Sequence, residues 1–133
     1  MTKQEAFDRA ARHLIAQGRK SSAEGAAVSQ CMYRGPGSTK CAIGALLTED
    51  EVGGLHSVMG EIYNTRPVTT ILRYHFVESI RSLDVDFLER LQAVHDGNAV
   101  PDWPLALRLF AEKWGLKATC VEEAMAANPG FPK

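Results

Sequence analysis

Apolar residues recur at helical spacing in several stretches of the chain, and short polar or glycine-containing segments separate them. In the first stretch Thr2-Lys-Gln-Glu5 has the pattern of a capping box, in which the threonine and glutamate side chains bind free N–H groups of the first turn. The apolar positions that follow are Phe7, Ala10, Ala11, Leu14 and Ile15. Gly18 then suits a left-handed helix end, so we predict a helix between Thr2 and Gly18.

Further amphipathic patterns predict helices over residues 67–80, 84–96, 103–114 and 119–126, with a short buried helix over 42–47. Thr48-Glu-Asp-Glu51 is a second capping box, but Gly53-Gly54 is expected to end that helix almost at once. Residues 55–64 show no regular pattern. Asp84 or Ser82 can cap one of the later helices, and Gly115 can end another.

The stretch Cys31-Met-Tyr-Arg-Gly-Pro-Gly-Ser-Thr-Lys-Cys-Ala-Ile-Gly44 departs from this helical pattern. Its Gly35-Pro36-Gly37-Ser38 core has the chemistry of a tight turn, because proline presets φ and glycine allows positive φ. The flanks predict a two-stranded ribbon. The expected fold class is therefore α-rich α+β, a single-domain bundle of about five helices with one short β-hairpin. This domain covers residues 1–133, and its tail, residues 128–133, is expected to be frayed.

Composition restricts the class of protein. Of the 133 residues 45% are hydrophobic and 23% charged, as in ordinary globular domains, and the net charge of −1 disfavours a nucleic-acid partner. The sequence has no apolar run long enough for a membrane span and no signal-peptide pattern at its start. The odd set of Cys31, Cys41 and Cys120 favours reduced thiols, so we expect a cytoplasmic protein without a membrane partner.

Cys41 and His95 are candidate catalytic residues. Cys41 lies near a predicted helix start, where the helix dipole and Lys40 would favour the thiolate. His95 would be the base of a small cysteine-dependent hydrolase or transferase, with Asp96 beside it. Adjacent residues of a helix point about 100° apart, so Asp96 is expected to orient His95 poorly. The alternative is that Cys41 is a core residue and that His95 and Asp96 end a helix.

Cys31 and Cys41 could also bind zinc together with His95 or His56, or form a regulatory disulfide. The nine residues between the two cysteines do not match the spacing of structural zinc sites. We favour two free cysteines and predict neither a metal nor a cofactor.

Gly35-Pro-Gly-Ser-Thr-Lys40 superficially resembles a phosphate-binding loop, but it lacks the Gly-Lys pair of the Walker pattern. Backbone N–H groups together with Arg34 and Lys40 could still bind a small anionic ligand. A protein that sequesters a nucleotide or signal molecule is therefore one alternative. An exposed turn with solvated charges is the other.

Our preferred interpretation is a non-enzymatic interaction protein that recognises a protein partner, or a small anionic ligand, through the 31–44 hairpin. Tyr33, Arg34 and Lys40 are the predicted binding residues, since aromatic and arginine side chains are frequent in interfaces. On this interpretation Arg34→Ala should weaken binding and leave the melting temperature almost unchanged.

Three segments carry a resemblance to a known family: Cys31-Met-Tyr-Arg-Gly35, Lys40-Cys-Ala-Ile-Gly44 and Leu91-Gln-Ala-Val-His-Asp96. In these segments the chain resembles a family of small uncharacterised proteins of phages, prophages and bacteria. Members usually continue with an Asp-Glu-Glu-Tyr-like stretch, where this chain has Asp50-Glu-Val-Gly-Gly54. The resemblance implies no established activity. It implies a phage-type setting, in which the partner could be a component of host defence or regulation in the cytoplasm of a bacterial or infected cell.

Overall fold

The structure is a computed structural model of the chain and describes residues 1–22 and 32–133. These residues contain seven α-helices and no β-strand. The α-helices are α1 (Lys3–Gln17), α2 (Glu49–Met59), α3 (Val68–Tyr74), α4 (Glu78–Arg81), α5 (Val85–Asp96), α6 (Trp103–Trp114) and α7 (Thr119–Ala127). The 3-10 turns are η1 (Pro36–Ser38), η2 (Gly44–Leu46), η3 (Gly60–Thr65) and η4 (Val100–Asp102).

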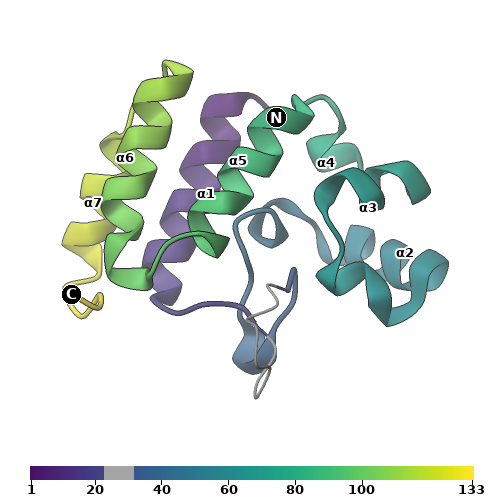
Figure 1. Cartoon of the computed structure of the whole chain (residues 1–133). Helices are drawn as coiled ribbons and strands as arrows, with labels where there is room; N and C mark the ends of the chain where they lie inside the picture. Colours follow the sequence, from purple (N-terminus) through teal and green to yellow (C-terminus); the bar gives the residue numbers. More distant parts are fainter. Residues whose placement is uncertain (23–31) are drawn as a thin grey trace.

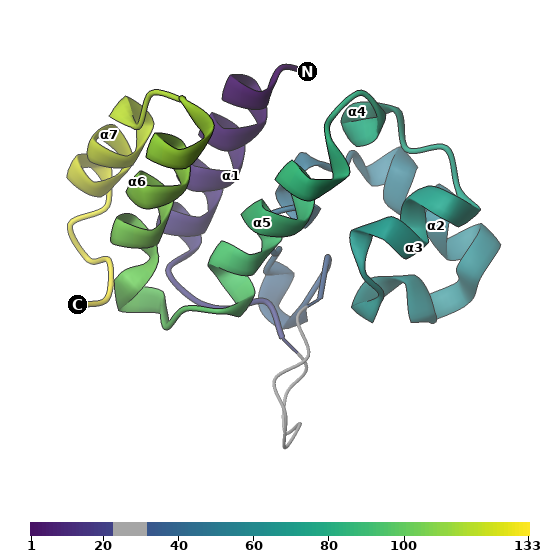
Figure 2. The same ribbon diagram turned by 45° about the horizontal axis from the view of Figure 1, so that its top comes forward.

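The helices form two groups on either side of α5. Helices α1, α6 and α7 lie together on one side, and α2, α3 and α4 lie on the other (Figures 1 and 2). Helix α1 packs against α5, α6 and α7, whereas α3 packs against both α2 and α5. Helix α5 therefore connects the two groups.

The predicted first helix is confirmed in detail. Thr2 Oγ1 accepts a hydrogen bond from Glu5 N at 3.1 Å, and Glu5 Oε1 accepts one from Thr2 N at 3.0 Å. Gly18 ends the helix with φ of +63°. The capping box and the terminal glycine thus act here through local interactions, as the sequence pattern indicates.

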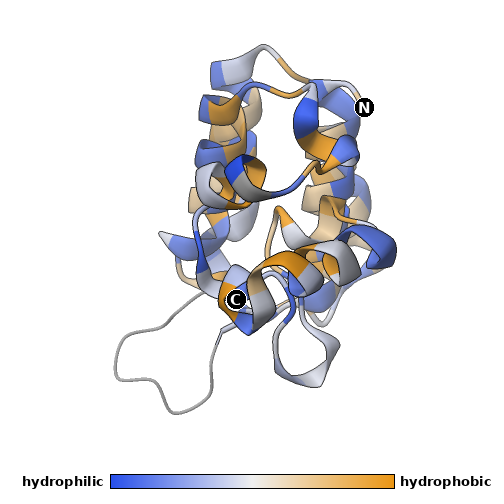
Figure 3. Cartoon of the chain, turned by 90° about the vertical axis from the view of Figure 1, so that its right-hand side faces the viewer, coloured by the Kyte–Doolittle hydropathy of each residue, from blue (hydrophilic) through white to orange (hydrophobic). Residues whose placement is uncertain are grey.

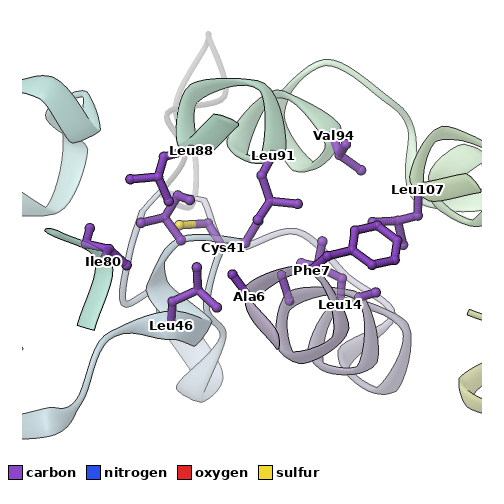
Figure 4. Close-up of a cluster of buried hydrophobic side chains, with 14 of the residues drawn as sticks. Ala6, Phe7, Leu14, Cys41, Leu46, Ile80, Leu88, Leu91, Val94 and Leu107 are labelled. Atoms are coloured by element: carbon purple, nitrogen blue, oxygen red, sulfur yellow. The ribbon is translucent and has the colours of Figure 1, made fainter. Parts of the chain in front are cut away.

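The core lies between the apolar faces of the helices. Figure 3 shows hydrophobic and hydrophilic residues on different sides of most helices, and Figure 4 shows side chains of α1, α5 and α6 meeting in the interior. Phe7 stacks on Phe110 with ring centroids 5.7 Å apart, and Phe87 meets Phe110 edge to face. The aromatic residues Trp103 and Phe110 of α6 therefore lie in the core.

No helix of the described residues is long and apolar enough to span a membrane. The longest, α1, has 15 residues, whereas a span needs about 20.

The predicted β-hairpin is wrong for the described residues. Gly35 and Thr39 form a single isolated β-bridge around η1, in which Gly37 has φ of +66°. Backbone groups of the flanks bind elsewhere: Tyr33 N donates to Asn64 O, and Lys40 N donates to Gln17 Oε1. Because these donors have partners on other elements, no ladder extends the bridge, and the fold is helical rather than α+β.

The glycine pair in α2 does not end that helix. Thr48 and Glu51 form the predicted capping box, and α2 continues through Gly53 and Gly54 to Met59. A Cβ atom on Gly54 would lie 2.5 Å from His75 Nε2. Gly54 therefore makes room for a neighbouring side chain, a packing reason that the sequence pattern does not contain.

The single helix predicted over 67–80 is broken into α3 and α4. His75 is extended, with φ of −148° and ψ of 145°, and separates the two. Glu51 of α2 satisfies the start of α4, because it accepts hydrogen bonds from Ser79 N at 2.9 Å and Ser79 Oγ at 2.6 Å. A contact between distant elements thus replaces the intrahelical bonds that one continuous helix would have made.

The C-terminal tail folds back on the end of α1. Phe131 is buried, and its N–H donates to Asn128 O at 3.0 Å. A Cβ on Gly18 would lie 3.3 Å from Pro132 Cδ. The tail expected to fray is therefore anchored through Phe131.

Candidate functional site

Arg34 binds main-chain oxygens of its own chain. Its Nη1 donates to Gly44 O at 2.6 Å and to Tyr33 O at 3.1 Å, and its Nη2 donates to Leu47 O at 3.1 Å. Nη2 also pairs with Glu49 Oε1 at 2.9 Å, and the side chain is only 17% exposed. The planar guanidinium suits this arrangement, since several donors point outward from one rigid group. Arg34 therefore holds the 44–49 turn against residue 33.

Tyr33 is also buried, with 4% of its surface exposed. Its hydroxyl donates to Arg66 O at 2.7 Å, and its N–H donates to Asn64 O at 3.2 Å. The Asn64 side chain pairs with the backbone of Arg34, accepting from its N–H at 2.8 Å and donating to its carbonyl at 2.7 Å. Residues 33 and 34 are thereby tied to the loop before α3.

Lys40 lies next to the same carboxylate as Arg34. Its Nζ is 3.8 Å from Glu49 Oε1, and its side chain is about one-third exposed. Its backbone N–H and C=O both bind the Gln17 side chain at the end of α1. The two predicted binding cations therefore meet Glu49, which offsets part of the positive charge expected to attract an anion.

His95 is fully buried and both of its ring nitrogens have partners. Nε2 accepts a hydrogen bond from Ser21 N at 3.0 Å, so the proton lies on Nδ1, which faces Asp96 Oδ1 at 2.8 Å. The ring also stacks on Trp103, with centroids 5.4 Å apart. The expectation that Asp96 orients His95 poorly is wrong, because at the last residue of α5 the carboxylate reaches back to its neighbour.

Cys41 lies in the core, near Leu46, Leu88 and Leu91 in Figure 4. Burial raises the pKa of its thiol to about 12, and the Asp96 carboxylate adds to this rise. A hydrogen bond of 3.3 Å from Gly44 N to the sulfur lowers the pKa but only partly offsets burial. At neutral pH the thiol is protonated, which is the opposite of what a nucleophile requires.

Alkylation of native protein is expected to spare Cys41. Iodoacetamide at pH 7 should modify Cys41 only after unfolding. The thiol is protonated at this pH, and its burial keeps the reagent from reaching the sulfur. Mass spectrometry of tryptic peptides measures this residue separately, since cleavage after Lys40 places Cys41 in its own peptide. Rapid native alkylation of that peptide would contradict the burial and the raised pKa.

Cys31, and with it the alternatives of a zinc site or a disulfide with Cys41, lies outside the described residues. Within the described part of the chain, no group of three or more His, Cys, Asp or Glu side chains is placed to hold a metal ion.

A cleft of about 390 Å³ adjoins the buried residues, and we call it the Tyr33 cleft. It is lined by Tyr33, Cys41, Thr65, Arg66, Pro67, Val68, Glu89, Gln92 and Asp96. Its volume falls in the range of small-ligand sites, about 300–1,000 Å³. Tyr33 and Cys41 are among the lining residues although each is almost completely buried, with 4% and 1% of its surface exposed. Of the five residues proposed from sequence, these two line the cleft, whereas Arg34, Lys40 and His95 do not.

One wall of the Tyr33 cleft is a face of α5. Glu89, Gln92 and Asp96 are three and four residues apart and so lie on one side of the helix. Gln92 is fixed by two hydrogen bonds, accepting from Ile43 N at 3.0 Å and donating to Asp96 Oδ1 at 2.9 Å. The opposite wall comes from residues 65–68. The helical spacing in α5 is visible in the sequence, but the partner wall is not.

Comparison with protein-family models, curated proteins and solved structures gives no match to this chain. Any inference about function therefore depends on the geometry of the Tyr33 cleft.

Proposed function

We propose that the chain is a non-catalytic binding protein whose Tyr33 cleft holds a positively charged side chain of a protein partner. The observation that carries this proposal is the charge around the cleft: among the described lining residues, Glu89 and Asp96 lie on one wall, and Arg66 is the one cation. The Asp96 carboxylate already holds His95 and Gln92, so the exposed Glu89 is the carboxylate that a ligand would meet first. Two carboxylates against one guanidinium favour a lysine or arginine side chain over an anion.

Binding is favoured over catalysis because the two candidate catalytic groups, the Cys41 thiol and the His95 imidazole, are not in reactive states. The Cys41 thiol has a raised pKa, and the His95 nitrogens both hold hydrogen bonds. A cysteine-dependent reaction needs a thiolate and a base with a free nitrogen. The hydrolase or transferase alternative therefore has less support than a binding role.

Binding of an anion or nucleotide also has less support. That alternative depends on Arg34 and Lys40, and both of these side chains meet Glu49. Neither lines the Tyr33 cleft.

The proposal is tested by titrating the ¹⁵N-labelled protein with three short peptides that differ only in a central arginine, norleucine or glutamate. We expect the arginine peptide to bind tightest and to shift amide signals of residues 65–68 and of α5. Glu89→Gln should weaken its binding about threefold, which corresponds to a partly exposed charge pair of about 0.6 kcal/mol.

Glu112→Gln is the matched control, because Glu112 is also an exposed helical glutamate but lies on α6, outside the cleft lining. It should leave the affinity unchanged. Equal binding of the three peptides, or an equal effect of both variants, would overturn the proposal. Tighter binding of the glutamate peptide would support an anionic ligand instead.

A further inference from the structure

We propose that a second surface, the groove between α5 and α6, binds an acidic amphipathic helix of a partner protein. The groove has a volume of about 320 Å³ and lies on the side of α5 that faces α6. Among the described residues, none lines both this groove and the Tyr33 cleft. The groove therefore constitutes a separate binding site.

Two leucines project from α6 beside this groove. Leu105 is 57% exposed and Leu109 is 56% exposed, although Leu107 between them is completely buried. Residues four apart in a helix are neighbours on its surface, so the two leucines form a continuous apolar ridge. This ridge is not part of the core, and exposed apolar patches of this kind mark interaction surfaces.

The groove beside the ridge is lined mainly by small and apolar side chains. Small side chains, Ala93 of α5 and Ala106 of α6, line it and leave space between the two helices. Val94 and Phe110 line it as well and are themselves almost completely buried. A partner helix could place its apolar side chains here at the spacing of successive turns, as helices do in hydrophobic grooves.

Charge decides which helix fits. Among the described residues, the lining contains Arg90 on α5 and Lys113 on α6 and no carboxylate. Arg90 is paired with Asp86 at 3.4 Å but remains about half exposed. Cations therefore lie on both walls of an apolar groove, which favours a helix with glutamate or aspartate along the edges of its apolar face.

The same charges argue against a second copy of this chain as the occupant. A two-fold dimer would place this groove against its own copy, because such an interface uses the same patch on both subunits. Arg90 and Lys113 of one subunit would then face those of the other. Like charges in that position weaken association.

The test uses a fluorescein-labelled helical peptide of about four turns, with a leucine face edged by glutamates, and a matched peptide with lysine for every glutamate. Fluorescence anisotropy should show the glutamate peptide binding at least about tenfold tighter, a difference of about 1.4 kcal/mol. The variant L105S/L109S should lose about tenfold or more of this affinity. Because both leucines are exposed, the variant should keep the circular dichroism spectrum of the folded protein.

The variant V58S/I62S is the control, since Val58 and Ile62 are equally exposed apolar residues outside the groove. It should bind the glutamate peptide as the wild type does. Equal affinity for both peptides, or unchanged affinity in L105S/L109S, would overturn the proposal. So would a dimer in sedimentation equilibrium that L105S/L109S dissociates, because the groove would then be a contact between copies. Failure at this groove leaves the Glu89 test of the Tyr33 cleft unaffected.

Discussion

Arg34→Ala is expected to lower the free energy of unfolding by about 3 kcal/mol, which corresponds to a fall of roughly 10 °C in Tm. The variant removes a guanidinium that donates to Tyr33 O, Gly44 O and Leu47 O and pairs with Glu49. Tyr33 O and Leu47 O would lose the guanidinium donor, and Gly44 O would keep only Leu47 N at 3.3 Å. An unsatisfied buried polar group costs about 1–3 kcal/mol. Urea unfolding followed by circular dichroism measures the loss.

Arg34→Lys should recover little of this stability, because an ammonium cannot present the same fork of donors to several carbonyls at once. Arg73→Ala is the control, since Arg73 is an exposed arginine of α3. It should change stability by less than about 0.5 kcal/mol. A change in Arg34→Ala no larger than in Arg73→Ala would contradict the structural role of Arg34. If Arg34→Ala left Tm unchanged, the result would contradict the structural role and would agree instead with the surface-binding interpretation of the sequence.

Gly44→Ala is expected to destabilise the protein by about 3 kcal/mol or more, the upper part of the range for overpacking. A Cβ on Gly44 would lie 2.2 Å from Tyr33 O and 3.0 Å from both Tyr33 C and Tyr33 Cα. These are backbone atoms and cannot rotate away as a side chain would. The displaced segment would also carry Gly44 O away from Arg34 and Gly44 N away from Cys41 Sγ.

Gly53→Ala provides a matched control with the opposite expected sign. A Cβ at Gly53 would meet nothing within 4 Å, and the residue lies inside α2. Alanine should therefore stabilise the protein by about 0.5–1 kcal/mol through the usual helical preference. Thermal unfolding of both variants under one condition compares them. Similar losses in both variants would show that close packing at Gly44 is not the cause.

The helices were predictable where their signals are local. The capping box of α1, its apolar face and the left-handed Gly18 all act within a few residues of each other. The prediction of helix boundaries fails where contacts with a distant element determine the backbone conformation. His75 is extended although its neighbours continue a helical pattern, and Glu51, which is distant in the sequence, binds Ser79 in the first turn of the next helix. Gly54 is retained inside α2 because His75 packs against it.

For the candidate site, the sequence predicted some of the residues but not their arrangement around a cleft. The sequence draws attention to Tyr33, Cys41 and the α5 pattern that includes Asp96, and these residues do line one cleft. Glu89 belongs to no motif, and nothing in the sequence indicates that Arg66 lies across a cleft from it. Their importance comes from the wall that each occupies, which depends on how α5 packs against the loop before α3.

By itself, the sequence determines a helical chain with well-defined helix ends, since capping and amphipathic spacing depend on neighbours in the chain. It also identifies the 31–44 stretch as exceptional. Tertiary structure alone decides what the described part of that stretch does: Arg34 binds carbonyls up to 13 residues away, and Tyr33 binds residues 64 and 66. Buried polar groups need hydrogen-bond partners, and the fold supplies them from distant elements. In place of the predicted hairpin, the described part of this stretch is therefore bound to distant residues and lines one side of the Tyr33 cleft through Tyr33 and Cys41.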